Sequence, residues 1–172
     1  MLKKLDPKKL KVNPFTLMED EWFLLAAGEK GDYNTMTCAW GSLGILWNKP
    51  IAVVFVRPTR HTYKFTNKYD RFTLSFFGKK CRPALKICGT KSGRDGDKVK
   101  EAGLTPVFTP KGNVYFQEAR MVLECKKIYF DDLDPKKFLD PQTEKNYPQK
   151  DYHRFYIGEI RNIYLPDHKP KK

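Results

Sequence analysis

The sequence predicts one mainly β domain, an antiparallel barrel or sandwich with a few short helices. Runs of apolar, β-branched and aromatic residues have the length of strands, and the Gly, Asp, Asn and Pro residues between them supply turn chemistry. The chain has 172 residues, of which 40% are hydrophobic, and this suits one core that needs no disulfide or metal. The expected strands lie within residues 22–28, 33–40, 51–56, 72–77, 114–130 and 154–165.

Helical signals are few and short. Capping residues predict helical turns that begin at Asp6–Pro7, Thr59, Asp95 and Asp134–Pro135. The turn after Asp6 is expected to end near residue 10, the helix after Thr59 near residue 69, and the helix capped by Asp95 at Gly103, because glycine tolerates positive φ. No repeat or linker divides the chain, so residues 1–172 are expected to form one domain with its core at about 10–165.

The charge balance gives the chain a formal net charge of +13, which attracts anions such as phosphate ligands, nucleic acid or an acidic partner protein. Many of the lysines lie in segments 3–11 and 169–172, where we expect solvated, mobile ends. The four cysteines form no C-x-x-C pair and lack zinc-like histidine spacing, so no metal is expected. Because no signal peptide or membrane-length apolar stretch appears, we expect a cytoplasmic protein that spans no membrane.

Four short motifs occur in a fixed order along the chain. They are N-T-M-T-C-A-W at 34–40, V-R-P-T-R-H-T-Y at 56–63, S-G-R-D-G-D-K at 92–98 followed by G-L-T at 103–105, and D-Y-H-R-F-Y-I-G-E-I at 151–160. In this order and at these intervals they resemble the flavin reductase-like, FMN-binding split-barrel family, and within it the flavoredoxin-type branch. The resemblance covers about residues 10–165 and implies an antiparallel Greek-key split barrel, bound FMN and a two-fold homodimer.

The motifs also carry the candidate ligand residues. Arg60 and Thr62 are expected in the first turn of the helix that follows Pro58, where free backbone N–H groups favour a phosphate. In the family, the lysine that matches Lys98 lies near the flavin phosphate, and the histidine that matches His153 lies near the flavin, which makes His153 the candidate catalytic residue. The full expected FMN-binding set is Asn34, Thr35, Met36, Thr37, Trp40, Arg57, Arg60, Thr62, Tyr63, Lys98 and His153.

Each of these residues also has a plain structural interpretation. Arg60 and Thr62 can cap a helix, Arg57 can be a solvated edge charge, Met36 and Trp40 can be core residues, and His153 can be a capping or surface residue. Alternation along an extended strand directs Asn34 and Met36 to one face and Thr37 to the other. His61 and His168 have only the interpretation of a surface or capping residue, and Ser92–Asp95 is expected to form a turn and a cap. The chain departs from the family pattern at Cys38, Ala39 and Ser75, which puts side-chain hydrogen bonds there in doubt.

The resemblance predicts flavin chemistry. Hydride transfer from NAD(P)H to a flavin needs no protein nucleophile, which agrees with the absence of a catalytic triad or paired carboxylates in the sequence. The first hypothesis is therefore an NAD(P)H-dependent flavin reductase, and the second is a flavoredoxin-like carrier that passes electrons to a redox partner protein. A third hypothesis, from another class, is a nucleic-acid-binding barrel that uses Tyr115, Tyr129 and Tyr156 on exposed strands.

Overall fold

The structure is a computed structural model, in which the backbone of residues 2–166 is described. His168, Lys169, Lys171 and Lys172 lie outside the described residues. The N-terminal lysines are not an extended tail, because Leu2–Leu5 forms strand β1 and Pro7–Lys9 forms the 3-10 helix η1. Strand β1 pairs with the end of the chain's last strand, so this basic segment is attached to the sheet instead of mobile as expected.

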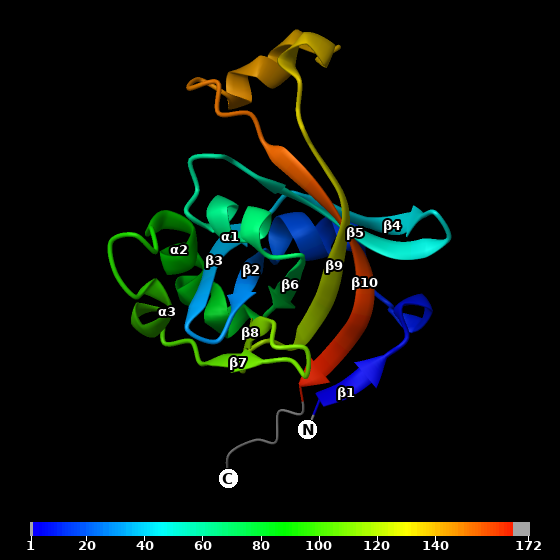
Figure 1. Cartoon of the computed structure of the whole chain (residues 1–172), viewed down its shortest axis with the longest axis vertical. Coiled ribbons are helices and arrows are strands. Elements are labelled where there is room, and N and C mark those ends of the chain that lie inside the picture. The colour runs from blue at the N-terminus through cyan, green and yellow to red at the C-terminus, as the bar shows by residue number, and fades with distance from the viewer. Residues whose placement is uncertain (1, 167–172) are drawn as a thin grey trace.

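An eight-stranded antiparallel sheet forms the frame of residues 2–166 and confirms the mainly β prediction (Figure 1). Its order is β3-β2-β6-β9-β10-β5-β4, with β1 beside β10. The consecutive strands β5 and β6 lie on opposite sides of the β9–β10 pair, so the chain crosses over between them as in a Greek key. The bounds are β2 Phe23–Glu29, β3 Asp32–Cys38, β4 Gly41–Leu46, β5 Lys49–Val56, β6 Arg71–Phe76, β9 Met121–Asp132 and β10 Arg154–Pro166.

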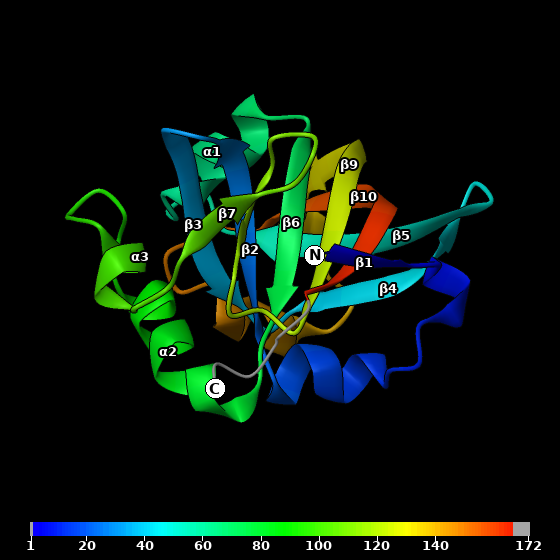
Figure 2. The same ribbon diagram turned by 90° about the horizontal axis from the view of Figure 1, so that it is seen from below.

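Short helices and a small hairpin cover the sheet. Strands β2, β3 and β6 run across the direction of β1, β4 and β5, and the hairpin β7–β8 lies against the first group (Figure 2). The remaining elements are η2 Thr16–Asp20, which is a π-helix, α1 Thr62–Lys68, η3 Lys79–Cys81, α2 Arg82–Thr90, α3 Lys98–Glu101, β7 Pro106–Phe108, β8 Val114–Phe116, η4 Pro135–Lys137 and η5 Pro141–Asn146. None of the helices within residues 2–166 is long and apolar enough to cross a membrane.

Two apolar clusters lie on the two faces of the central strands. Because side chains alternate along a strand, Leu25 packs into one cluster with Met36 and Phe72, whereas its neighbour Leu24 packs into the other with Leu85 of α2. The first cluster fills the space enclosed by the curled sheet, and the second lies under α2, α3 and the β7–β8 hairpin. The two-sided burial explains why segment 22–28 is an almost continuous apolar run.

Gly158 lets the sheet curl tightly where β10 passes β9. The register between these strands shifts at Ile157/Gly158 and again at Ile160/Asn162. A Cβ at Gly158 would lie 2.5 Å from Phe72 Cζ and 2.8 Å from Cys125 Cβ. Glycine is therefore required by the close approach of the first core cluster, as is typical of glycine at a bulge.

The segment between β9 and β10 forms a lobe of residues 133–153 that stands away from the rest of the chain (Figure 1). It contains η4 and η5, and each of these helices has proline in its first turn. An aspartate precedes each helix, and its carboxylate accepts a hydrogen bond from a backbone N–H of the first turn. Helix η4 begins at Pro135 as the Asp134–Pro135 signal predicts. Leu139, in the loop between the two helices, is 98% exposed.

Several local predictions were wrong. Helix α2 was not expected, although Pro83 in its first turn and the buried Ala84, Leu85 and Cys88 indicate one apolar helical face. Strand β4 was read as turn, because Gly41 and Gly44 are turn-forming residues. Gly41 instead permits close pairing, since a Cβ there would lie 2.8 Å from the Val53 carbonyl oxygen.

The expected caps also differ from the structure. Helix α3 begins at Lys98 with Asp97 as its N-cap, because the Asp97 carboxylate accepts the Lys100 N–H at 3.0 Å, and Asp95 has no such role. Helix α1 begins at Thr62, and the Thr59 hydroxyl donates to Asp151 across the chain instead of capping it. Segment 114–130 is two strands, β8 and β9, separated by a turn at 117–120.

Candidate functional site

A buried polar corner joins β3 to the start of α1. The Asn34 amide Nδ2 donates to the Thr62 hydroxyl at 2.9 Å, and both side chains are buried although they are 28 positions apart. Gly93 completes the corner, because a Cβ there would overlap the Asn34 amide oxygen. The predicted motifs at 34–40, 56–63 and 92–98 therefore meet at one place.

Arg94, Lys64 and Lys98 make this corner electropositive around His61, which has a polar atom without a partner among the described residues. Its Nδ1 is buried and has no hydrogen-bond partner among the described residues. Burial lowers the pKa of His61, and the nearby cations Arg94, Lys64 and Lys98 lower it further, while Asp95 raises it. His61 thus stands at the N-cap position of α1, but its side chain makes no capping hydrogen bond, its ring contacts Phe65, and one of its nitrogens is buried.

Arg60 and Lys98 lie at the carboxyl end of α2. The Arg60 guanidinium donates to the Gly89 carbonyl at 2.7 Å, and the Lys98 ammonium donates to the carbonyls of Cys88 and Lys91, both at 3.1 Å. These cations satisfy carbonyls that the helix end leaves without partners. Burial lowers the pKa of Lys98 to about 8. A guanidinium has five N–H donors, so Arg60 retains donors for a ligand.

A slot of about 200 Å³ follows the end of β3. Residues 36–40 form one wall, and Phe55, Arg57 and His153 form the other. The Trp40 and His153 rings are 5.2 Å apart between centroids, and Trp40 is 48% exposed at the mouth of the slot. The buried Cys38 thiol has its pKa raised to about 12 by burial, so the thiol is neutral.

His153 is the polar group of the slot. Its Nδ1 lies 2.9 Å from the Tyr147 hydroxyl, which comes from the lobe, and its ring contacts Phe55 and Trp40. Burial, followed by the charge of Arg57, lowers the pKa of His153 to about 4, so the imidazole is neutral at neutral pH. If the Tyr147 hydroxyl donates to Nδ1, the proton of the neutral ring is on Nε2 and can be donated elsewhere.

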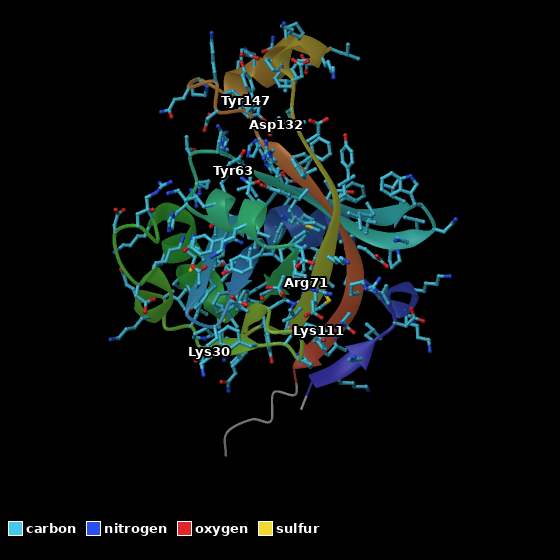
Figure 3. All side chains as sticks on the ribbon, viewed as in Figure 1. Lys30, Tyr63, Arg71, Lys111, Asp132 and Tyr147 are labelled. Atoms are coloured by element: carbon cyan, nitrogen blue, oxygen red, sulfur yellow. The ribbon has the colours of Figure 1, made fainter. Side chains whose placement is uncertain are left out.

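Arg57 connects the slot to the lobe. Its guanidinium forms an ion pair with Asp151 at 2.6 Å, donates to the Asn146 carbonyl at 2.8 Å, and lies 5.0 Å from the centre of the Tyr147 ring. Figure 3 shows Tyr147 in the lobe above Tyr63 of α1. Arg57 is therefore not a solvated edge charge.

Three predicted ligand residues have their side chains engaged elsewhere. The buried Thr35 hydroxyl donates to the Leu25 carbonyl, and the Thr37 hydroxyl donates to the Leu85 carbonyl of α2 at 2.5 Å. Tyr63 packs against the first core cluster, and the Arg154 guanidinium carbon lies 5.3 Å from the centre of the Tyr63 ring. Met36 is buried in the core cluster and Thr37 faces α2, as the strand alternation predicts.

The remaining predicted residues fall into two connected groups along β3. Asn34 and Thr62 meet beside Gly93, with Arg60 and Lys98 at the carboxyl end of α2, whereas Met36, Trp40, Arg57 and His153 line the slot. An extended strand advances about 3.3 Å per residue, so the corner and the slot follow each other along one strand. A molecule with an anionic tail and a flat ring fits this arrangement. The buried His61 nitrogen, which has no partner within residues 2–166, and the Gly93 cradle provide the polar end, and the aromatic slot provides the flat end.

Sequence reasoning missed Phe55 and Tyr147. Phe55 lies at an outward position of the predicted strand 51–56, so its alternation could have indicated it. Tyr147 lies in an irregular lobe, and no local pattern places it beside His153. The tyrosines of the nucleic-acid hypothesis are not an exposed set, since Tyr115 and Tyr156 are buried and Tyr129 is 43% exposed.

The chain is similar to known proteins in sequence and in fold. Residues 18–172 match the model of the flavin reductase like domain family. An uncharacterized protein of Pyrococcus abyssi is 28% identical over 142 residues, which cover 80% of this chain and 69% of the relative.

Two solved structures show the same fold at low sequence identity. An FMN-binding domain of a flavin reductases-like enzyme from Shewanella baltica has a TM-score of 0.70 and 16% identity, over 96% of this chain and 78% of that one. A flavoredoxin from Methanosarcina acetivorans has a TM-score of 0.66 and 23% identity, over 92% of this chain and 76% of that one. The chain thus belongs to the flavin reductase like domain family and has the antiparallel split-barrel fold of its FMN-binding members.

Proposed function

We propose that this protein binds FMN, with the phosphate at the Asn34–Thr62–Gly93 corner and the ring in the slot beside Trp40 and His153. The observation that carries the proposal is the corner itself. Two buried polar side chains from distant segments and a glycine cradle converge beside Arg60 and Lys98, together with a His61 nitrogen that has no partner in the described part of the chain. Cationic and donor groups of this kind recognise a phosphomonoester.

The roles of the residues follow from their surroundings. Thr62 and Arg60 donate to the phosphate, and the Lys98 ammonium supplies a positive charge from the end of α2. Trp40 and Phe55 hold the flat ring, and the neutral His153 donates a hydrogen bond from Nε2 into the slot. When bound, FMN supplies the capacity to accept a hydride or single electrons, which no side chain of the protein provides.

We propose that the physiological activity is NAD(P)H-dependent flavin reduction. The slot is open to solvent at Trp40, so a second ring can approach a bound flavin without rearrangement of the sheet. Stopped-flow mixing of the FMN-loaded protein with NADH or NADPH tests this. Rapid bleaching of the flavin absorption supports the reductase, whereas bleaching only by a reduced protein favours the flavoredoxin-like carrier.

Thr62→Val tests the FMN site. Valine keeps the volume of threonine but removes the hydroxyl, which leaves the buried Asn34 amide without its partner. We expect FMN affinity to fall at least about tenfold, because one hydrogen bond to a charged group is worth about 1.5–3 kcal/mol. The exposed Thr105→Val is the matched control and should leave affinity unchanged. Equal FMN titrations for both variants would contradict the proposed site.

We also propose that the protein is a homodimer of the cytoplasm. The projecting lobe with its exposed Leu139 supports the dimer, because a second copy can cover such a surface. The free cysteines Cys38, Cys81, Cys88 and Cys125 support a reducing compartment. Sedimentation equilibrium at the mass of one chain, 20.2 kDa, would contradict the dimer.

A further inference from the structure

We infer that the protein has a second binding site next to the slot, which takes a planar aromatic molecule and binds a neutral or cationic one more tightly than an anionic one. The site is a groove of about 590 Å³, here named the aromatic groove, which is lined by Phe15, Met18, Glu19, Trp40, Phe55 and Tyr147, among others. Trp40 and Phe55 also line the slot, so a molecule in the groove lies beside whatever the slot holds.

The walls of the aromatic groove indicate a flat occupant. Four aromatic residues converge on it although they are distant in the sequence: Phe15 just before η2, Trp40 just before β4, Phe55 of β5 and Tyr147 of the lobe. Phe15 is 80% exposed and Trp40 is 48% exposed, so both present large apolar surfaces to water. Exposed aromatic rings gathered in one concave surface are typical of a ligand site. The volume falls within the range of about 300–1,000 Å³ that is usual for small-molecule sites.

The local backbone keeps the groove open. Leu17 and Met18 of the π-helix η2 are buried and anchor it, while the adjoining Phe15 and Glu19 remain exposed at the groove. A Cβ at Gly41 would lie 3.2 Å from Met18 Sδ, so the glycine gives the floor its room. π-helical turns are rare and often occur at functional sites.

The charge of the groove decides which ring it accepts. The chain as a whole carries +13, yet among the described residues that line the groove the one charged side chain is Glu19. Asp20 and Glu21 follow it directly, and Glu21 is already paired with Arg120. The Arg57 guanidinium lies 5.0 Å from the centre of the Tyr147 ring, but its charge is balanced by the ion pair with Asp151. Glu19 therefore disfavours anions in the groove, and a cation gains from both Glu19 and the aromatic faces.

Three two-ring probes of matched size separate the charges: N-methylquinolinium, quinoline and 2-naphthoate. Binding is followed by NMR through the Trp40 indole N–H signal, assigned with Trp40→Phe. One charge about 5 Å away, in water with 0.1 M salt, changes affinity about two- to threefold. We therefore expect the cation to bind about fivefold more tightly than the anion, with quinoline between them.

Two variants and one control complete the test. Glu19→Gln should remove the difference between the three probes, whereas Glu29→Gln, an exposed glutamate on β2, should preserve it. Phe15→Ala, at a mostly exposed position that the core does not need, should weaken all three probes about three- to tenfold. Equal affinities of the wild-type protein for cation and anion, or no shift of the Trp40 signal with any probe, would overturn the inference.

A second copy of the chain is the competing occupant. In that case the Trp40 signal shifts with protein concentration and not with probe, which also overturns the inference. That the molecule in the aromatic groove reacts with a bound flavin rests on the proposed function. That the groove binds such a molecule does not. The titrations are therefore run with and without saturating FMN. Loss of FMN binding with retained probe binding would contradict the proposed function alone.

Discussion

Glu124 holds the β7–β8 hairpin to the main sheet, and Glu124→Gln should destabilise the protein strongly. The carboxylate is fully buried and accepts four side-chain hydrogen bonds. One oxygen accepts from Thr109 at 2.5 Å and Asn113 at 2.6 Å, and the other from Asn162 at 2.7 Å and Tyr164 at 3.1 Å. Thr109 and Asn113 belong to the turn of the hairpin, whereas Asn162 and Tyr164 belong to β10.

The magnitude follows from the count of donors. A glutamine has one acceptor oxygen, so its NH₂ group must face two of the four donors. A hydroxyl can rotate to accept from that group, but an asparagine NH₂ cannot, so either one donor loses its acceptor or an asparagine amide must flip away from its present contacts. Because hydrogen bonds to a charged group are lost as well, we expect the free energy of unfolding to fall by about 2–4 kcal/mol.

Urea denaturation at pH 7, followed by tryptophan fluorescence, measures this loss, with Glu29→Gln as the matched control. Burial alone would raise the pKa of Glu124, but its four donors outweigh burial and hold the pKa below its ordinary value. The stabilisation is therefore present above the unfolded pKa of about 4.3 and is lost as the pH falls through the folded pKa. A loss below about 0.5 kcal/mol for Glu124→Gln at pH 7 would refute the reasoning.

Three further predictions concern single residues. Gly158→Ala should lower the free energy of unfolding by about 2 kcal/mol or more in the same urea assay, because the new methyl overlaps the Phe72 ring and Cys125; unchanged stability would contradict the close approach. Ser75→Ala should leave stability equal or raise it by about 1 kcal/mol, because the buried Ser75 hydroxyl has no hydrogen-bond partner among the described residues, and a marked loss would reveal one. His153 has a folded pKa lowered to about 4, so the unfolded chain binds the proton first and stability should fall as the pH drops from about 6.5 to 4. Thermal melts across this range should show a weaker decline for His153→Gln, and an identical decline would contradict the lowered pKa.

Local patterns predicted most strands, because β-branched and aromatic runs have strand length and alternate. They failed where a residue type suits more than one local structure, or where two neighbouring residues suit the same role. Gly41 is turn-forming in general, but here it permits close strand pairing, so β4 was missed. Asp95 and Asp97 are both good N-caps, and only the backbone shows which carboxylate reaches an N–H.

The site residues that could be predicted are those that belong to one of the four motifs. Asn34, Thr62 and Gly93 are far apart in the chain, and only a resemblance to a family could place them together before the structure did. The engagement of the Thr35 and Thr37 hydroxyls with backbone carbonyls depends on the neighbouring strand and on α2, which no local pattern reveals. The Tyr147–His153 contact depends on how the lobe folds back, so it too required the structure.

The double use of Arg57 means that the lobe and the slot cannot move independently. Its guanidinium holds Asp151 and the Asn146 carbonyl, and the same side chain forms part of the slot wall. A lobe that swung outward would withdraw His153 from the slot and release Arg57 from its anchors at once. Filling the slot should accordingly slow amide hydrogen exchange throughout residues 133–153, although most of that segment lies beyond the reach of any ligand there.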